Sequence, residues 1–393
     1  MTVVGLDAFV AELDEFFAGH SPAPSAMSTF RLAPDAVSSK ADVEADAELK
    51  AAVAWRQELA QAGLHWVSGP TELGGRGLPA SFEAVLRGRE AAEGVTDSSP
   101  LRVGISIVGP TIDQYGSPSV RAKYLPRIHR GELLVCQLLS EPAAGSDLAG
   151  VRTTAHRDEG NWVVTGQKVW TSGGRHADVG ECLAVTDRGA GRKGLTMFLV
   201  DMHAPGVEVR PITQMTGGQE FCEVFLTDVV VDEEDRLGDE GGGWEVALHT
   251  LANERAALGS ELVPDASLIG YLVELARAHG VQEDPLHRQA IARSHVDLQV
   301  TRLLADRVFA DGPAGPRSGM VKLSMTRMLA GVSSAAAGIL GPHMTVTGVS
   351  PTADLWSELL LGTPGLRIGG GTDEILQNLL GERVLGLPRE PKP

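Results

Sequence analysis

The sequence predicts a multidomain α+β protein: a helical N-terminal domain, a middle β-domain built as a small antiparallel sheet or barrel, and a C-terminal helical bundle. Apolar residues recur at helical spacing in the first third of the chain, and long helical periodicities return in the last third. Between them lie short runs rich in β-branched and aromatic residues. Because strands and helices do not alternate, a doubly wound parallel sheet is excluded. We therefore expect three domains, over residues 1–134, 135–240 and 241–393.

The first third contains three predicted helices. Residues 42–62 place apolar side chains such as Leu49 and Leu59 near helical spacing. A glycine-rich segment then breaks the pattern, and further helical segments follow near residues 81–93 and 118–130.

The middle third is predicted to form strands separated by Gly, Asp and Pro. The candidate strands are residues 162–164, 182–185, 195–200, 207–209 and 224–226. A helix is expected to begin near Gly243, and the helical pattern of the last third is broken at Asp284-Pro285 and at Gly341-Pro342.

Composition excludes several classes of protein. Of the 393 residues, 43% are hydrophobic and 22% are charged, so the chain can bury a sizeable core. The 34 Lys and Arg against 51 Asp and Glu give a net charge of −17, which would repel a phosphate backbone and argues against a nucleic-acid partner. The three cysteines have no short spacing that would indicate a disulfide framework or a metal site.

The N-terminus lacks the pattern of a signal peptide, and no membrane-spanning segment is expected. We therefore expect a cytoplasmic protein without a metal and without a membrane association.

Three segments combine small residues with hydroxyl groups. Residues 140–147 would let a flat ligand approach the backbone, although a surface turn is the simpler interpretation. In residues 165–174, Trp170 stands beside hydroxyls and glycines, where it is either a core residue or a stacking surface. In residues 369–375, three glycines and Thr372 predict a helix N-terminus that is either an ordinary cap or a site for an anion or carbonyl group.

A fourth segment carries an adjacent acid and base. Glu254 and Arg255 interrupt an apolar stretch of the helix that begins near Gly243. Taken alone, such a pair is more often a surface ion pair than a catalytic one.

Together these segments resemble the acyl-CoA dehydrogenase family, over a region from about Trp55 to Pro388. The matching passages are Ala62 to Leu64 with Gly74 to Gly77, Ser140 to Asp147, Gly166 to Lys168 with Trp170, Gly194 to Val200, Arg210 to Ile212, Glu220-Phe221 with Glu223 to Phe225, Gly243-Trp244, Glu254-Arg255, and Gly371 to Ile375 with Glu382 to Pro388.

The resemblance implies a helical N-terminal domain, a middle β-domain and a four-helix bundle, assembled as a tetramer with FAD between the β-domain and the bundle. It also implies the reaction: a base removes the α-proton of an acyl-CoA thioester, and the β-hydrogen passes as hydride to flavin N5, giving the trans-2-enoyl-CoA.

A carboxylate must serve as that base. In many relatives it precedes the Gly-Thr of the last motif, but that position here is Gly370, which has no side chain. A second group of relatives carries the base on the bundle helix directly before an Arg, which here is Glu254 before Arg255. We therefore assign the base to Glu254, with Arg255 and Gly370 beside the substrate. In this group the acyl chains are branched, long or ring-bearing, and include steroid side chains.

The resemblance assigns further residues one by one. Ser146 is expected at the pantetheine or phosphate end of CoA. The expected flavin contacts are Leu138, Leu139, Ser140, Trp170, Thr171, Ser172, Gly371, Thr372 and Glu374, with Arg277, Arg288 and Gln289 reaching the FAD of a neighbouring subunit. The last three depart from the family pattern, because residues 276–280 lack the Phe of the usual R-x-x-F-G motif.

Several alternatives remain open on this fold. The substrate is an acyl-CoA or a carrier-protein thioester, and electron-transfer flavoprotein is the electron acceptor that the family implies. The chain forms a homotetramer or a heterotetramer, and it could be a catalytically impaired or non-catalytic partner subunit. Flavin oxidases and monooxygenases also use this scaffold, so fold alone does not separate them.

Overall fold

The computed structural model describes residues 5–19, 42–95, 99–261, 263–264, 267–310, 315–346, 348 and 350–389. These residues form two compact units. The first contains the described residues up to 212 together with 221–250, and the second contains residues 213–220 and those from 251 onward. The predicted division into three domains stays a prediction.

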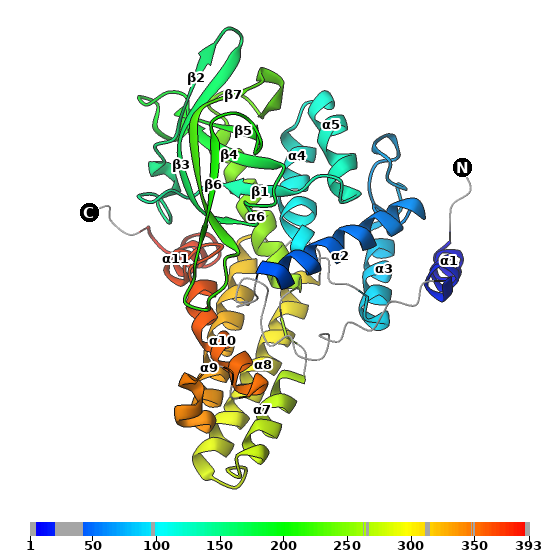
Figure 1. Ribbon diagram of the computed structural model, residues 1–393, viewed down its shortest axis with the longest axis vertical. Helices are drawn as coiled ribbons and strands as arrows, with labels where there is room; N and C mark the ends of the chain where they lie inside the picture. Colours follow the sequence, from blue (N-terminus) through cyan, green and yellow to red (C-terminus); the bar gives the residue numbers. More distant parts are fainter. Residues whose placement is uncertain are drawn as a thin grey trace. The chain divides into compact units, whose positions relative to one another are not determined.

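Helices make up the N-terminal part of the first unit, as the sequence predicts (Figure 1). They are α1 (Leu6–Gly19), α2 (Asp42–Gln61), α3 (Ala80–Glu93), α4 (Gly109–Tyr115) and α5 (Pro118–His129). The three predicted helices correspond to α2, α3 and α5. Sequence analysis missed α1, whose buried Phe9, Leu13 and Phe17 recur every four residues and pack with Trp55 and Leu59 of α2.

The middle of the first unit is an eight-stranded sheet in the order β6-β7-β3-β2-β4-β5-β8, with β1 paired to β4. The strands are β1 (Val135–Leu138), β2 (Thr154–Asp158), β3 (Asn161–Ser172), β4 (Val179–Val185), β5 (Leu195–Asp201), β6 (Val207–Ile212), β7 (Phe221–Val231) and β8 (Arg236–Leu237). Most strand pairs are antiparallel, as expected, but β1 and β2 both pair with β4 in parallel, which sequence analysis did not predict. Parallel pairing requires long connections, and β1 is joined to β4 through β2 and β3.

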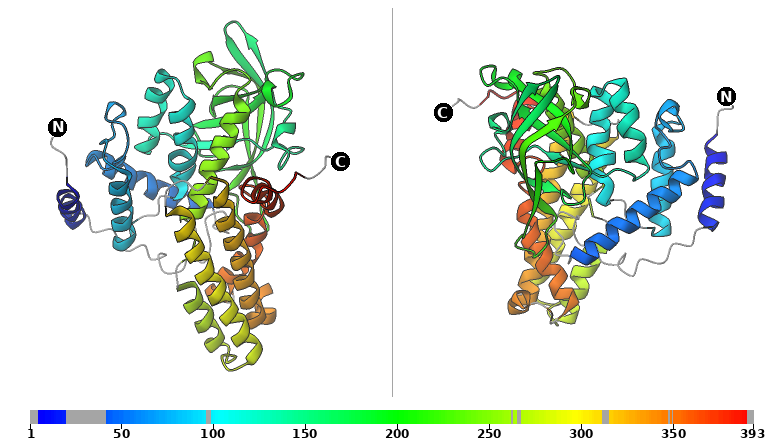
Figure 2. Two further views of the ribbon diagram at one scale, coloured as in Figure 1. Left: turned by 180° about the vertical axis from the view of Figure 1, so that it is seen from behind. Right: turned by 45° about the horizontal axis from the view of Figure 1, so that its top comes forward.

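The second unit is a helical bundle (Figure 2). Its helices are the second half of α6 (Gly243–Glu261), α7 (Ser267–Ala278), α8 (Pro285–Phe309), α9 (Ser318–Leu340), α10 (Pro351–Leu366) and α11 (Asp373–Arg383). Asp284, at the predicted break, caps α8 by accepting hydrogen bonds from the backbone N–H groups of Leu286 and His287. Helix α9 packs against α7, α8, α10 and α11 and is the centre of the bundle.

Single helical turns connect these elements. They are η2 (Thr71–Leu73), η3 (Ser99–Leu101), η5 (Leu148–Gly150), η6 (Gly191–Gly194), η7 (Glu233–Asp235), η8 (Gly315–Arg317) and η9 (Gly341–Thr345), with a π-helical segment η4 (Val103–Val108) before α4.

One segment of the described chain, Gly315–Thr345, is long and apolar enough to span a membrane by length and composition, which sequence analysis did not expect. It contains α9, and most of it is buried inside the protein. Core helices of globular proteins have the same composition.

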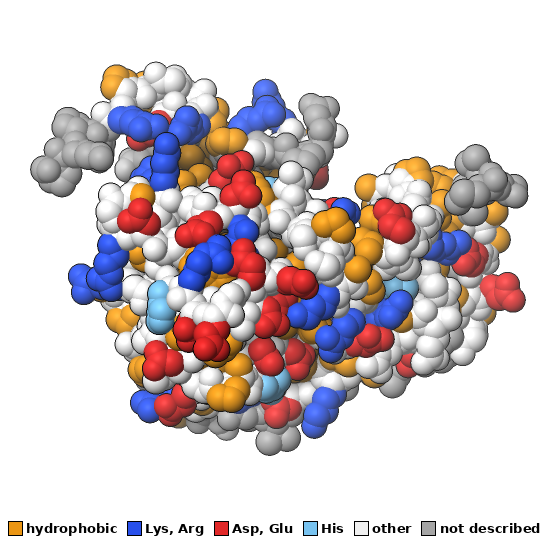
Figure 3. Space-filling model, turned by 90° about the horizontal axis from the view of Figure 1, so that it is seen from above, with side chains coloured by type: hydrophobic (Ala, Val, Ile, Leu, Met, Phe, Trp, Pro, Cys, Tyr) orange, Lys and Arg blue, Asp and Glu red, His pale blue; other side chains and the backbone are white. Residues whose placement is uncertain are grey.

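On the face drawn in Figure 3, acidic and basic side chains are intermixed.

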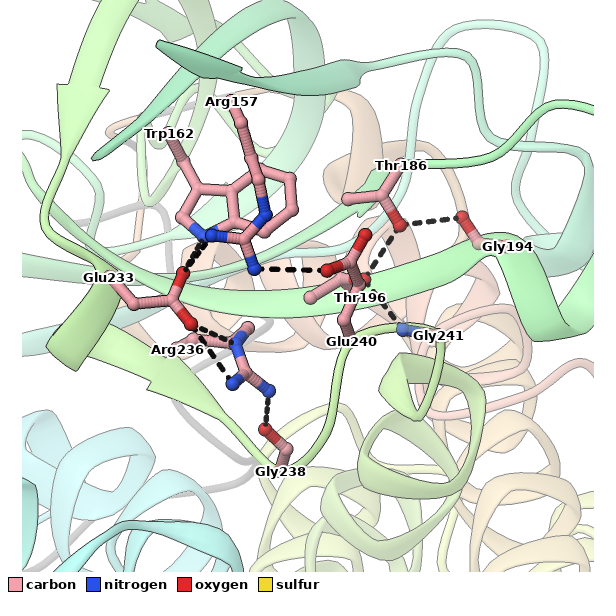
Figure 4. Close-up of polar contacts among 10 residues, drawn as sticks. All are labelled: Arg157, Trp162, Thr186, Gly194, Thr196, Glu233, Arg236, Gly238, Glu240 and Gly241. Carbon is pink, nitrogen blue, oxygen red and sulfur yellow. Dashed lines mark hydrogen bonds and ion pairs between the residues drawn. The ribbon is translucent and has the colours of Figure 1, made fainter. Parts of the chain in front are cut away.

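A polar cluster fixes the segment between the sheet and α6 (Figure 4). Glu233 accepts hydrogen bonds from the Trp162 indole, from Arg157 (3.1 Å) and from Arg236 (3.1 and 3.2 Å). Arg157 also binds Glu240 (3.0 Å). Asp235 accepts hydrogen bonds from Lys123 and Tyr124, both at 2.9 Å. The chain therefore leaves the sheet in a fixed direction.

The Gly243-Trp244 motif has a steric explanation. A Cβ atom on Gly243 would lie 2.6 Å from the backbone of Thr196, so only glycine lets the first turn of α6 contact β5. The N–H group of Gly241 donates to the Thr196 hydroxyl (3.0 Å). Further along α6, the buried Thr250 donates to Glu181 of β4 (2.7 Å). These contacts fix the helix one turn before Glu254.

Two histidines are buried in the helical part of the first unit. His65 is 5% exposed, and neither of its ring nitrogens has a hydrogen-bond partner among the residues that the structure describes. The backbone carbonyls of His65 and His129 both bind the buried Arg56. Burial, with a smaller contribution from Arg56 and Arg130, lowers the pKa of His65 to about 4. Burial also lowers the pKa of His129, whose ring stacks on Trp66 at 3.8 Å. Both rings are therefore neutral in the folded protein.

Stability should fall in mild acid. Unfolded His65 binds a proton near pH 6.5, and folded His65 binds one only near pH 4. The contribution of the neutral His65 to the free energy of unfolding is therefore fully present above pH 6.5 and is lost as the pH falls toward 4. The loss should reach about 3 kcal/mol for this group, since each pKa unit corresponds to about 1.36 kcal/mol. Urea unfolding between pH 7 and 4 measures it. In His65→Phe the free energy of unfolding should depend less steeply on pH, by the uptake of one proton. In His156→Phe, a substitution at an exposed position of β2, this dependence should equal that of wild type. Identical slopes for wild type and His65→Phe would contradict the assignment.

Candidate active site

A buried lysine joins two of the segments that sequence analysis singled out. Lys168 of β3 is fully buried, and its ammonium group donates to Glu141 Oε1 (2.9 Å) and to the carbonyl oxygens of Leu139 (3.2 Å) and Leu183 (2.7 Å). Directly after it, the N–H group of Val169 donates to the carbonyl oxygen of Ser140 (2.9 Å). The segments 138–147 and 165–174 are thus brought together.

Glu141 is satisfied from two sides. Besides Lys168, its carboxylate accepts hydrogen bonds from the backbone N–H groups of Arg152 (2.6 Å) and Thr153 (2.9 Å). Burial by itself would raise the pKa of Glu141, but the charge of Lys168 and the hydrogen bonds from Thr153 and Arg152 outweigh it, and the pKa is lowered. Glu141 therefore stays ionised and fixes the start of the turn that contains Ser146, whose side chain is exposed.

Trp170 lies at an irregularity of β3. The pairing of β3 with β7 shifts register between Lys168 and Thr171, and Trp170 adopts a positive φ of 61°, which is strained for a bulky residue. Its ring is 58% exposed and makes an edge-on contact with Phe221, with ring centroids 5.9 Å apart. A strained backbone that exposes a large aromatic ring is typical of a ligand site.

The neighbouring hydroxyls suit a flat ligand with polar edges. The Thr171 hydroxyl is buried, and no hydrogen-bond partner for it is found in the part of the chain that the structure describes. Ser172 is exposed, and Ser140 is half-buried beside Val169. An exposed aromatic ring together with an unsatisfied buried hydroxyl fits the edge and face of a flavin ring.

The second unit holds Glu254 and Arg255 on α6, both half-buried. Removal from water raises the pKa of Glu254, opposed by the charges of Arg255 and Lys322. Burial lowers the pKa of Arg255, opposed by Glu254, and the Arg255 Nε atom is buried with no hydrogen-bond partner among the described residues. The surface-pair interpretation of these two residues therefore does not fit their surroundings.

Lys322 of α9 is a site residue that sequence analysis missed. It is 1% exposed and donates hydrogen bonds to the carbonyl oxygens of Gly369 and Gly371. Burial lowers its pKa to about 8, opposed by Asp373 and Glu254. The available signal was a single charge inside an apolar run, Gly-Met-Val-Lys-Leu, at residues 319–323. Lys322 binds the residues on both sides of Gly370, and its charge acts on Glu254. The two alternative positions for the base are therefore both influenced by this one charged side chain.

Several contacts hold the glycine turn that leads into α11. Arg367 and Asp373, at its two ends, form an ion pair at 2.8 Å in which the Asp373 carboxylate is buried. Thr372 caps α11 as predicted, by accepting a hydrogen bond from the N–H group of Ile375 (3.2 Å). Gly370 and Gly371 have φ angles of 65° and 94°, which explains the need for glycine at both positions.

Four of the remaining predicted residues are exposed, whereas the side chains of Leu138 and Leu139 are buried. Arg277 lies at the end of α7. Arg288 and Gln289 lie in the first turns of α8, and Arg288 forms an ion pair with Glu283 (3.4 Å). Glu374 is exposed in the first turn of α11. Their roles at the flavin stay predictions.

Comparison with known proteins identifies the family. Three acyl-CoA dehydrogenase models match in succession: the N-terminal domain over residues 31–132, the middle domain over 136–229 and the C-terminal domain over 241–385. The acyl-CoA dehydrogenase IpdE1 of Mycobacterium tuberculosis is 40% identical over 346 residues, which cover 86% of this chain and 89% of that protein. The acyl-CoA dehydrogenase FadE34 of the same organism is 38% identical over 91% of this chain and 49% of its own length.

Solved structures give the same result. The steroid ACAD Tcur3481-Tcur3483 has a TM-score of 0.75 at 28% identity, over 99% of this chain and 100% of that chain. The ChsE4-ChsE5 complex of Mycobacterium tuberculosis has a TM-score of 0.76 at 26% identity, over 99% and 100% of the two chains. The fold and its sites thus define an oxidoreductase of the flavoprotein type. The chain belongs to the acyl-CoA dehydrogenase family, whose typical cofactor is FAD.

Lys168→Met should strongly destabilise the sheet. The substitution would leave the buried Glu141 carboxylate without its counter-ion and two carbonyl groups without a donor, a loss of about 3–5 kcal/mol for a broken buried ion pair. Urea unfolding followed by tryptophan fluorescence measures it. The double variant Lys168→Met/Glu141→Gln should recover part of the loss, because the stranded charge is then removed. A single variant as stable as wild type would show that the pair does not hold the two segments together.

Proposed function

We propose that this protein catalyses the FAD-dependent α,β-dehydrogenation of an acyl-CoA thioester to the trans-2-enoyl-CoA, with Glu254 as the base. One observation carries the proposal: Glu254 is half-buried with a raised pKa beside Arg255 and within electrostatic range of Lys322, while Gly370 has no side chain. The chain therefore carries a carboxylate at one of the two positions where the family places its base.

The environment of Glu254 suits proton abstraction from carbon. A desolvated carboxylate with a raised pKa is a stronger base than one in water. The positive charges of Arg255 and Lys322 oppose that rise and so favour the ionised carboxylate, the form that accepts the α-proton. When bound, FAD accepts the β-hydrogen as hydride. Arg255 is proposed to hold the substrate end or to tune Glu254, and Gly370 to leave the α-carbon accessible.

Cofactor and substrate contacts follow the family pattern in this proposal. The exposed Trp170 ring and the unsatisfied Thr171 hydroxyl support a flavin site in the first unit. Ser146 is proposed to bind the pantetheine or phosphate end of CoA. The proposed FAD contacts are Leu138, Leu139, Ser140, Trp170, Thr171, Ser172, Gly371, Thr372 and Glu374, with Arg277, Arg288 and Gln289 acting across a subunit interface.

We propose a bulky, ring-bearing acyl group as the substrate. Two points support this class: the proposed base, Glu254, lies on the bundle helix, and a similar structure is titled a steroid ACAD. Electron-transfer flavoprotein is the proposed acceptor, a homotetramer or heterotetramer the proposed assembly, and the cytoplasm the proposed location. The titles of the two heterocomplexes, Tcur3481-Tcur3483 and ChsE4-ChsE5, make a mixed assembly worth testing.

An anaerobic titration of the purified protein tests the proposed reaction. Straight-chain, branched and steroid-side-chain acyl-CoAs are added in turn while the flavin absorbance is followed. Bleaching by the steroid class alone is the expected result. A colourless protein would support the non-catalytic partner subunit, and a yellow protein that no acyl-CoA bleaches would favour a carrier-protein thioester or an oxidase or monooxygenase reaction.

Glu254→Gln should abolish turnover while FAD stays bound. Removal of the general base should lower kcat by at least about 10²–10⁴-fold, because the amide cannot accept the α-proton. The matched control is Glu245→Gln, an exposed position on the same helix, which should keep wild-type kcat. Steady-state kinetics and the flavin absorbance per chain measure both. Activity of Glu254→Gln near the wild-type level would sink the assignment of the base.

A further inference from the structure

Lys322 occupies an unfavourable place for a charged group. Its helix, α9, is the centre of the bundle, and the residues around it in the sequence, Val321 and Leu323, are buried with it. Removal of an ammonium group from water costs free energy unless hydrogen bonds and opposite charge compensate. Two carbonyl oxygens, of Gly369 and Gly371, provide the hydrogen bonds. None of the ion pairs in the described part of the chain involves Lys322, so its charge is not neutralised by direct contact.

We propose that Lys322 is a positioning residue for catalysis: its ammonium group fixes the glycine turn at residues 369–371 and directs its positive charge to the base Glu254. This inference rests on the proposed function and deepens it, by naming a residue that acts through Glu254 without itself contacting the reacting atoms.

The turn needs an external support. A backbone hydrogen bond from Asp373 to the carbonyl oxygen of Arg367 (3.1 Å) closes the turn, but Gly370 and Gly371 have no side chains that could hold the glycine part from within. The ion pair between Arg367 and Asp373 joins its two ends. Among the hydrogen bonds found for the described residues, the carbonyl groups of Gly369 and Gly371 are bound only by Lys322. Lys322 therefore supports the glycine part of the turn, the stretch that the family uses at the substrate.

The charges around Glu254 favour its ionised form. The charges of Arg255 on α6 and of Lys322 on α9 both lower the pKa of Glu254. Asp373 of α11 also faces Lys322, but it is in direct contact with Arg367. Two positive charges thus act on one carboxylate. Removal of Lys322 would leave Arg255 alone to oppose the desolvation that raises the pKa of Glu254.

The pH dependence of kcat/KM separates this role from a purely structural one. In Lys322→Met, which is similar in length but uncharged, the acidic limb should move to higher pH by about one unit, because a neighbouring opposite charge typically lowers a carboxyl pKa by that amount or more. In Lys322→Arg the charge remains, so the acidic limb should stay in place even if kcat falls. The control Lys193→Met, at an exposed lysine, should match wild type in both limbs.

The alkaline limb gives a second readout. Since the pKa of Lys322 is lowered to about 8, the wild-type kcat/KM should decline as the pH rises through that value and the ammonium charge is lost. Arg stays protonated, so Lys322→Arg should show no decline there. If Lys322→Met does not fold, Lys322→Arg is sufficient for the test. A decline of kcat/KM near pH 8 that persists in Lys322→Arg would overturn the proposal.

Hydrogen–deuterium exchange tests the turn without any turnover. In Lys322→Met the amides of residues 369–376 should exchange at least tenfold faster than in wild type or in Lys193→Met. Unchanged exchange together with an unmoved acidic limb would refute the positioning role. These outcomes are distinct from failure of the proposed function, which would appear as a wild-type protein that no acyl-CoA bleaches or as an active Glu254→Gln.

Discussion

The contact between Lys168 and Glu141 is the interaction on which the predicted flavin side of this protein depends. An ammonium group and a carboxylate without access to solvent are tolerated only because each is fully hydrogen-bonded. The same contacts connect strand β3 with the turn after β1. Trp170 and Thr171 come two and three residues after Lys168. The strained backbone of Trp170 and the Thr171 hydroxyl, which has no partner among the described residues, therefore lie next to a rigid support.

A second buried lysine has a related but different role in the bundle. Lys322 also binds two backbone carbonyl groups, and it also fixes a turn rich in small residues. Lys168 is neutralised by a carboxylate at 2.9 Å, whereas Lys322 has no such contact among the described residues. The first lysine is therefore a structural ion pair, and the second retains charge that acts on Glu254. Both side chains are almost fully buried, so the two lysines differ in whether a carboxylate is in contact with the ammonium group and not in burial.

Helix α6 begins in the unit that contains the sheet and carries Glu254, the proposed base, in its second half. Its start is fixed by the close contact of Gly243 with Thr196, by the polar cluster around Glu233 and by the hydrogen bond from Thr250 to Glu181. These contacts orient the first half of α6, which belongs to the same unit as the sheet. They explain why a glycine stands in the Gly-Trp motif at the start of the helix.

The sequence by itself determined the order of helices, strands and helices, the family, and the candidate base, because periodicity and motif spacing are local properties of the chain. It predicted α2, α3, α5 and the main strands, and it placed the cap of α11 at Thr372. Only the tertiary structure decided that β1 and β2 pair in parallel with β4, that Lys168 joins the two small-residue segments, and that Lys322 supports the glycine turn. Each of these depends on residues far apart in the chain, and the burial that gives a charged side chain its role exists only once the chain has folded.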